Sequence, residues 1–214
     1  GEFSSVTLSC ESMAPVCPAG TLSFTVDAGL DAGVDAGLPP WDVVQLSAAW
    51  THICARTDAG AVWCWGQNPQ LSPAPFNLTR PTQVQGLPPV IDIATTSNAT
   101  CALTVDGEVL CFGSASRLNI NQLADGGIYG ARTIDAGVRF EDLSGGGSNM
   151  CGLNRDGGLF CWGQNGGGML GRGFNSTEEQ WPAPPDGGGP WSFVALGSTH
   201  ACGLDVQRRA WCWG

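Results

Sequence analysis

The chain has 214 residues, 43% of them hydrophobic and only 13% charged, and its nine arginines, without any lysine, face nineteen acidic residues for a net charge of −10. Nucleic-acid binding draws its affinity largely from clustered cations that release counterions, so this composition argues against nucleic acid as a partner. The sequence contains no run of about 18 apolar residues, and we therefore expect no transmembrane segment.

The first 40 residues precede any repeat. Residues 1–25 contain Cys10 and Cys17, which we expect to bridge each other in the remnant of a Cys-containing N-terminal segment. Residues 26–40 contain three Asp-Ala-Gly copies and no aromatic residue, and they cannot bury enough surface to fold. We predict a disordered acidic linker there. Calcium binding by its aspartates is a weaker alternative, because no bidentate Glu or fixed loop follows them.

From residue 41 onward, eight cysteines follow one rule. Each pair encloses nine residues, and the pairs recur with a period near 50; they are Cys54/Cys64, Cys101/Cys111, Cys151/Cys161 and Cys202/Cys212. A fixed period of this length is typical of stacked supersecondary units. The sequence therefore predicts four repeats, at residues 41–89, 90–139, 140–190 and an incomplete 191–214.

The second cysteine of each pair stands between large apolar residues, as in Trp63-Cys64-Trp65. In a strand, residues i and i+2 share a face, so each repeat presents an apolar stripe on one face and its cysteine on the other. The two cysteines of a pair are expected to flank a three-residue hairpin loop whose third residue is left-handed. Glycine supplies that residue in three repeats, and Arg208 in the fourth should cost about 1 kcal/mol.

The same register places paired cysteines opposite each other, close to the lower limit of Cα separation that a disulfide accepts. We predict four local disulfides, each worth about 2.7 kcal/mol in the chain-entropy model. Four pairs of buried free thiols are the alternative. A zinc site is weaker still, because structural zinc ligands are usually two to four residues apart. Disulfides in this number indicate an oxidising compartment.

The intervals between repeats contain further extended pieces, for example at 81–86 and 131–137. They bring each repeat to about four strands, the content of one propeller blade. The remaining loops, such as 67–79 and 114–130, are long, and loops carry function more often than strands do. The aromatic residues expected to bind a partner from such loops are Phe76, Tyr129, Phe174 and Trp181.

Residues 41–214 resemble the regulator of chromosome condensation repeat family. The third repeat matches it best, through Cys151-Gly152-Leu153, Asp156-Gly157, Cys161-Trp162-Gly163, Gln164-Asn165 and Leu170-Gly171. The paired cysteines look like the variant found in exported bacterial members. The resemblance implies an all-β, seven-bladed propeller, so the four repeats are expected to continue into further blades of a longer chain. It also implies a secreted, periplasmic or outer-surface protein, with any leader or lipid anchor upstream.

Nothing in the sequence favours catalysis, a cofactor or a metal. His52 and His200 occupy one repeat position, which indicates a structural role, and the glycine run at 145–147 is followed by neither a lysine nor a helix. The favoured function is a non-catalytic extracellular binding module whose protein or glycan partner contacts loops on one rim. The alternatives implied by the resemblance are an inhibitor of a secreted enzyme, as in the β-lactamase inhibitory propeller, and, less favoured, a guanine nucleotide exchange factor.

Overall fold

The computed structural model describes residues 5–9, 21–25, 42–67, 77–113 and 132–214. The chain divides into two compact units, Gly1–Trp41 and Asp42–Gly214. In the first unit, β1 (Ser5–Ser9) pairs antiparallel with β2 (Thr21–Thr25), a hairpin that sequence reasoning did not anticipate. Cys10, Cys17 and the linker at 26–40 lie outside the described residues. No helix in the described part of the chain could span a membrane.

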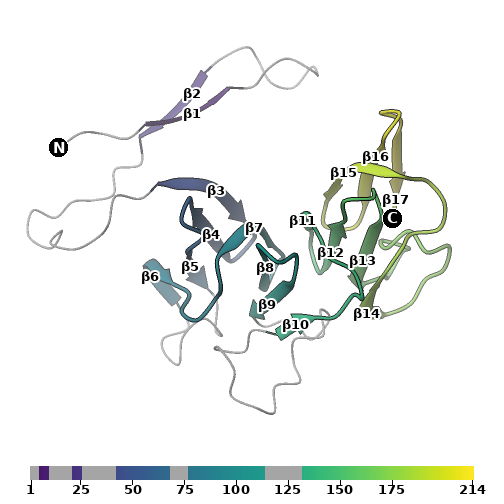
Figure 1. The fold of residues 1–214 in the computed structure, drawn as a ribbon, viewed down its shortest axis with the longest axis horizontal. Helices are drawn as coiled ribbons and strands as arrows, with labels where there is room; N and C mark the ends of the chain where they lie inside the picture. The colour runs from purple at the N-terminus through teal and green to yellow at the C-terminus, as the bar shows by residue number, and fades with distance from the viewer. Residues whose placement is uncertain (1–4, 10–20, 26–41, 68–76, 114–131) are drawn as a thin grey trace, which may run out of the picture. The chain divides into compact units, whose positions relative to one another are not determined.

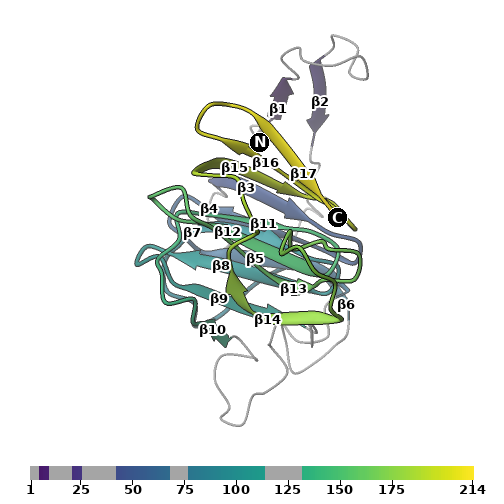
Figure 2. The ribbon, with the colours of Figure 1, turned by 90° about the vertical axis from the view of Figure 1, so that its right-hand side faces the viewer.

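The second unit consists of four antiparallel sheets, which follow one another in chain order (Figures 1 and 2). The first sheet is β3 (Val43–Ala48), β4 (His52–Thr57), β5 (Val62–Gln67) and β6 (Asn77–Gln83); the second is β7 (Val90–Thr95), β8 (Ala99–Thr104), β9 (Val109–Gly113) and β10 (Arg132–Ile134); the third is β11 (Asp142–Gly145), β12 (Asn149–Leu153), β13 (Leu159–Gln164) and β14 (Glu178–Ala183); and the fourth is β15 (Trp191–Leu196), β16 (Ala201–Asp205) and β17 (Ala210–Trp213). Each sheet is a simple meander, and the predicted all-β architecture is confirmed.

In the first two sheets, the fourth strand lies at or near the extended piece that the sequence predicts between repeats. β6 overlaps the predicted piece at 81–86 but begins earlier, at Asn77, and β10 lies within 131–137. β6 and β14 contain Pro81 and Pro182, and both strands lie at the edge of their sheets. An edge strand tolerates proline because one row of its N–H groups has no partner strand.

The hairpins that join the second and third strands have the predicted loops. The last residue before each loop pairs with the first after it, as in the 2.9 Å bond from the Thr57 N–H to the Ala61 carbonyl. The third loop residue has a positive φ in all four hairpins: 78° at Gly60, 75° at Gly107, 76° at Gly157 and 63° at Arg208. The structure therefore confirms the loop length and the exceptional left-handed arginine.

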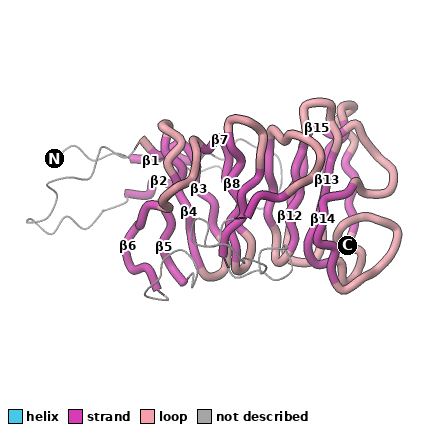
Figure 3. Tube along the Cα trace, turned by 60° about the horizontal axis from the view of Figure 1, so that its bottom comes forward, coloured by secondary structure: helices cyan, strands magenta, loops and turns pink. Residues whose placement is uncertain are grey.

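The core lies between successive sheets, where the apolar stripe of one sheet covers the cysteine face of the preceding one. In the first junction, Ile93 and Phe112 pack in one cluster with Cys54 and Cys64. The other two junctions repeat this arrangement, with Leu143 and Trp162 beside Cys101–Cys111, and Val194 and Trp213 beside Cys151–Cys161. Figure 3 shows the sheets stacked side by side in this order.

Candidate functional site

The four predicted cysteine pairs are disulfide-bonded, with Cα separations of 4.0–4.1 Å. In each pair the two cysteines are directly opposed across the hairpin. The first three bonds are completely buried beneath the next sheet, whereas Cys212 in the fourth is exposed. These bonds staple individual hairpins, and none joins two sheets.

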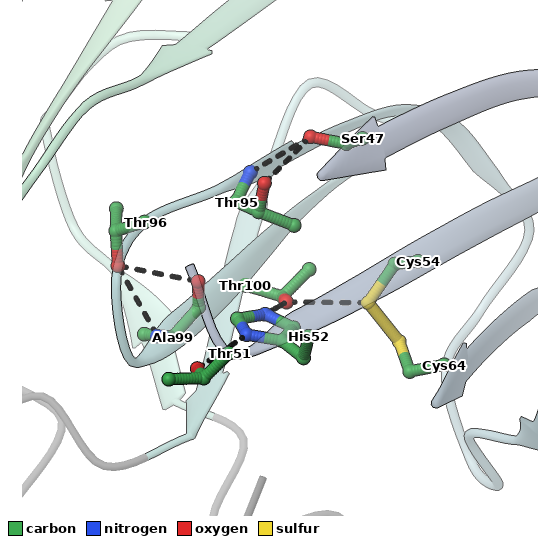
Figure 4. The surroundings of a disulfide bond; sticks show 9 residues. All are labelled: Ser47, Thr51, His52, Cys54, Cys64, Thr95, Thr96, Ala99 and Thr100. Carbon is green, nitrogen blue, oxygen red and sulfur yellow. Dashed lines mark hydrogen bonds between the residues drawn. A yellow bond between two sulfur atoms is a disulfide. The ribbon is translucent and has the colours of Figure 1, made fainter. Parts of the chain in front are cut away.

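His52 connects the first two sheets (Figure 4). Its side chain is 2% exposed, with Nε2 lying 2.8 Å from Thr100 Oγ1 and Nδ1 lying 3.3 Å from Thr51 Oγ1. The Thr51 hydroxyl donates to the Ser97 carbonyl, so Nδ1 is assigned as the donor to Thr51 and Nε2 as the acceptor from Thr100. Burial lowers the pKa of His52 to about 4, which keeps the ring neutral near pH 7.

His200, at the same repeat position in the fourth sheet, is exposed and lies against Gly197. The two histidines therefore occupy equivalent positions in very different surroundings. The described residues contain no cluster of three or more His, Cys, Asp or Glu side chains that could hold a metal ion.

Two of the four aromatic residues predicted to bind a partner lie among the described residues. Phe76 and Tyr129 lie outside the described residues. Phe174 lies in the loop between β13 and β14 and is 51% exposed. Trp181 is 55% exposed, but it belongs to strand β14, so its placement in a loop was wrong.

The loop that contains Phe174 is held by two polar side chains. Asn165 is fully buried, and its Nδ2 donates to the Phe174 carbonyl at 3.0 Å while its Oδ1 accepts from the Leu170 N–H at 3.1 Å. Arg172 donates to the Trp181 carbonyl at 3.0 Å and pairs with Glu179 at 3.2 Å. Phe174 and Trp181 thus belong to one pinned hairpin.

A hollow of about 180 Å³ lies where loops from all four sheets meet. Because neighbouring strands are antiparallel, the connections after the first strand of each sheet, at 49–51, 96–98, 146–148 and 197–200, belong to the same end of their sheets. We call this the neutral end. Trp50 lines the hollow and is 88% exposed, more than any other large apolar side chain in the described part of the chain.

The glycine run at 145–147 forms part of the wall of this hollow and explains how the loops meet. A Cβ on Gly145 would overlap the carbonyl oxygen of Thr95, and one on Gly147 would lie 2.6 Å from the Ser198 carbonyl oxygen. The close approach allows the Ser97 N–H to bond the Gly147 carbonyl at 2.9 Å, and the Gly147 N–H to bond Gly197 at 3.3 Å. The glycines therefore allow the backbones of neighbouring sheets to approach closely.

The residues that line the hollow differ in charge from the hairpin loops at the opposite end. None of the residues that line the hollow is ionisable: they are Ala48, Ala49, Trp50, Thr95, Ser97, Gly145, Gly146, Gly147, Leu196, Gly197 and Ser198. The hairpin loops at the opposite end, at 58–61, 105–108, 154–158 and 206–209, carry aspartates and arginines. We call this the charged end.

A polar ladder ties the first strands of three sheets together. Gln45 Nε2 donates to Asp92 Oδ1 at 2.5 Å and to the Ile93 carbonyl at 3.1 Å. Asp92 Oδ2 in turn accepts from the Leu143 N–H at 2.7 Å. Burial and the neighbouring Asp92 carboxylate raise the pKa of Asp142 to about 6. This ladder stabilises the arrangement that forms the hollow.

Sequence reasoning missed Trp50. The residue stands outside the aromatic stripe of the repeats, and its equivalents in the other three are Ser97, Gly147 and Ser198. A comparison of the four repeats contains the signal: one copy carries a large aromatic residue where the others carry small residues. Its significance becomes clear only once the four loops are brought together.

Residues 43–70 and 90–117 match the regulator of chromosome condensation (RCC1) repeat. The chain is 28% identical over 191 residues to the human RCC1-like G exchanging factor-like protein, covering 80% of this chain and 40% of that protein. It is 24% identical over 193 residues to the mitochondrial RCC1 domain-containing protein RUG3 of Arabidopsis thaliana, covering 81% of this chain and 43% of that protein. The chain thus spans less than half the length of either relative.

The fold is similar to that of yeast RCC1 (Prp20), solved in complex with Kap60. The TM-score is 0.67 at 20% sequence identity, and the match covers 83% of this chain and 45% of that chain. Together with the four meandering sheets, this likeness shows a β-propeller fold.

Proposed function

From the premise that this chain is a member of the regulator of chromosome condensation repeat family, we propose that it is a non-catalytic extracellular binding module. Its partner contacts the neutral end of the sheets, where Trp50 stands at the hollow. The module is secreted, periplasmic or displayed on the outer surface.

The exposure of Trp50 carries the proposal. An indole that is 88% exposed to water gains nothing for folding, and exposed apolar groups of this size commonly mark interaction sites. Tryptophan is also among the residues most enriched at the energetic centres of interfaces. The hydrogen bond from Thr51 Oγ1 to the Ser97 carbonyl, 2.7 Å long, fixes the loop beside it, so little order has to be gained on binding.

The disulfides support the extracellular part of the proposal. Four bonded pairs in one short chain are typical of proteins that fold in oxidising compartments. One relative is described as mitochondrial, so the compartment needs its own test. Mass spectrometry of the natural protein, alkylated before lysis, should find the four bonds intact.

The binding surface is tested by quantitative capture of a partner from the cell surface and culture medium. We expect Trp50→Ala to weaken capture by at least about 30-fold, the effect of a hot-spot residue worth about 2 kcal/mol. Val105→Ala is the matched control, because Val105 is also exposed but lies in a loop of the charged end. Equal capture by both variants, or selective loss with Val105→Ala, would show that the partner does not bind at the neutral end.

Inhibition of a secreted enzyme is a second candidate, favoured by the exposed pair Phe174 and Trp181 on one hairpin. It predicts that a captured enzyme loses activity and that Trp181→Ala restores it. The name of the human relative suggests nucleotide exchange as a third candidate. Release of labelled nucleotide from small GTPases measures this activity directly, and we expect none.

A further inference from the structure

We propose that the hollow beside Trp50 binds the ring of a neutral sugar. The inference rests on the proposed function and narrows it, since it makes the partner of the neutral end a glycan or a glycosylated protein.

The first argument is size. Pockets for drug-sized molecules usually measure about 300–1,000 Å³, and the hollow measures about 180 Å³. It is therefore suited to one small ring rather than to a folded peptide segment or a nucleotide. The loops that surround it come from four sheets, and they are joined across two of the junctions by the backbone bonds of Gly147 to Ser97 and Gly197. The hollow is thus built before a ligand arrives.

The second argument is the kind of surface that the walls offer. The indole of Trp50 provides one flat face, and the electron-rich face of an aromatic ring attracts the weakly positive C–H bonds of a sugar. Most of the other lining residues are small, and they include three consecutive glycines and the hydroxyl-bearing residues Ser97 and Ser198. Hydroxyl groups both donate and accept hydrogen bonds, as do those of a sugar.

The third argument is charge. No lysine, arginine, aspartate or glutamate lines the hollow, and the whole chain carries a net charge of −10. A phosphate, sulfate or carboxylate group on the ligand would find no cation to pair with and would be repelled by the acidic protein. A basic group on the ligand would likewise find no carboxylate to pair with in the hollow. A neutral hexose or pentose is the class that remains.

The test starts from a glycan array probed with the full chain, followed by titration of the best neutral monosaccharide observed by NMR chemical shifts. We expect binding to uncharged glycans, a loss of at least about 10-fold with Trp50→Ala, and partial retention with Trp50→Phe. Phe193→Ala is the matched control, because it removes an exposed aromatic ring from strand β15 that does not line the hollow, and it should leave the affinity unchanged.

The two proposals fail in different ways. Binding confined to sialylated or sulfated glycans, or neutral binding that survives Trp50→Ala, overturns the sugar site. If no glycan binds while Trp50→Ala still abolishes capture of a partner, the sugar site falls and the proposed function stands. Enzymatic deglycosylation of a captured partner should release it, and a partner that stays bound counts against the sugar site. If Trp50→Ala changes neither readout, both proposals are wrong.

Discussion

At the residue scale, Asn149 stands out because it is completely buried and neither its Nδ2 nor its Oδ1 has a hydrogen-bonding partner in the structure. Its equivalent in the first repeat, His52, is bonded to Thr100 of the next sheet. In the fourth sheet the position equivalent to Thr100 is occupied by Ala201. The third junction therefore lacks the hydroxyl that satisfies the first.

Ala201→Thr should supply this hydroxyl. We expect the free energy of unfolding to rise by about 1 kcal/mol, the typical net value of one hydrogen bond, when measured by urea denaturation. Ala201→Val is the control, because it adds similar volume without the hydroxyl. A threonine variant no more stable than the valine variant would show that Asn149 is not paired by it.

His52 should make stability depend on pH. Its pKa is about 4 in the folded chain and about 6.5 when the chain is unfolded, so the unfolded state takes up the proton first as the pH falls. The contribution is complete above about pH 6.5 and is lost progressively as the pH falls toward 4. Between pH 7 and 4.5 this loss amounts to about 2 kcal/mol.

The measurement is urea denaturation of the wild type and of His52→Asn, the residue that the third repeat carries at this position, at both pH values. The difference between the two proteins isolates His52 from Asp142, whose raised pKa acts in the opposite direction over part of this range. We expect the stability of the wild type relative to the variant to decrease as the solution is acidified. A constant difference would mean that the imidazole titrates normally in the fold.

At the element scale, the four hairpins share one design but differ in protection. Three disulfides are sealed beneath the stripe of the following sheet, whereas Cys212 is exposed to solvent. Thiol–disulfide exchange requires access of a thiolate to a sulfur atom. The Cys202–Cys212 bond should therefore be reduced first.

The order of reduction can be read by brief treatment of the native protein with a mild thiol, alkylation and peptide mass spectrometry. Cys202 and Cys212 should be labelled many-fold faster than the other six cysteines of the sheets. Equal labelling of all four pairs under conditions in which circular dichroism shows an intact fold would contradict the burial of the first three.

The hairpins also show what local sequence can predict. The spacing of the cysteines and the glycines at 60, 107 and 157 determine loop length and register through short-range geometry, and these predictions were confirmed. The exact start of β6 was not predictable from the sequence. The bounds of an edge strand depend on which residues of its neighbour, here β5, offer hydrogen-bonding partners, and no sequence signal marks that point. Trp181 was misplaced for the same reason.

At the scale of the whole molecule, contact between sheets decides the site. The fold class followed from the repeat itself, whereas the hollow depends on four loops that are about 50 residues apart in the chain. Neither the exposure of Trp50 nor the function of the glycine run is a local property. Both follow from how closely neighbouring sheets approach, which residue periodicity alone does not specify.

Gly145→Ala tests this close approach. Gly145 does not require a left-handed backbone, but a Cβ would overlap the carbonyl oxygen of Thr95 in the preceding sheet. We expect a loss of about 1–3 kcal/mol in thermal or urea unfolding, the range for an overpacked contact. Gly166→Ala is the control, since its nearest atom would be Gln164 Nε2 at 3.7 Å. Equal stability of the two variants would argue that the second and third sheets are less tightly apposed.

The cysteine face of one sheet packs against the apolar stripe of the next, and this arrangement is repeated at all three junctions. A gene segment that encodes one such unit can therefore be duplicated in tandem, because the new copy meets an apolar stripe on one side and a cysteine face on the other. Each copy then remains free to vary at its loop tips. A single tryptophan among serines and glycines is the kind of change by which one copy acquires a task that its siblings lack.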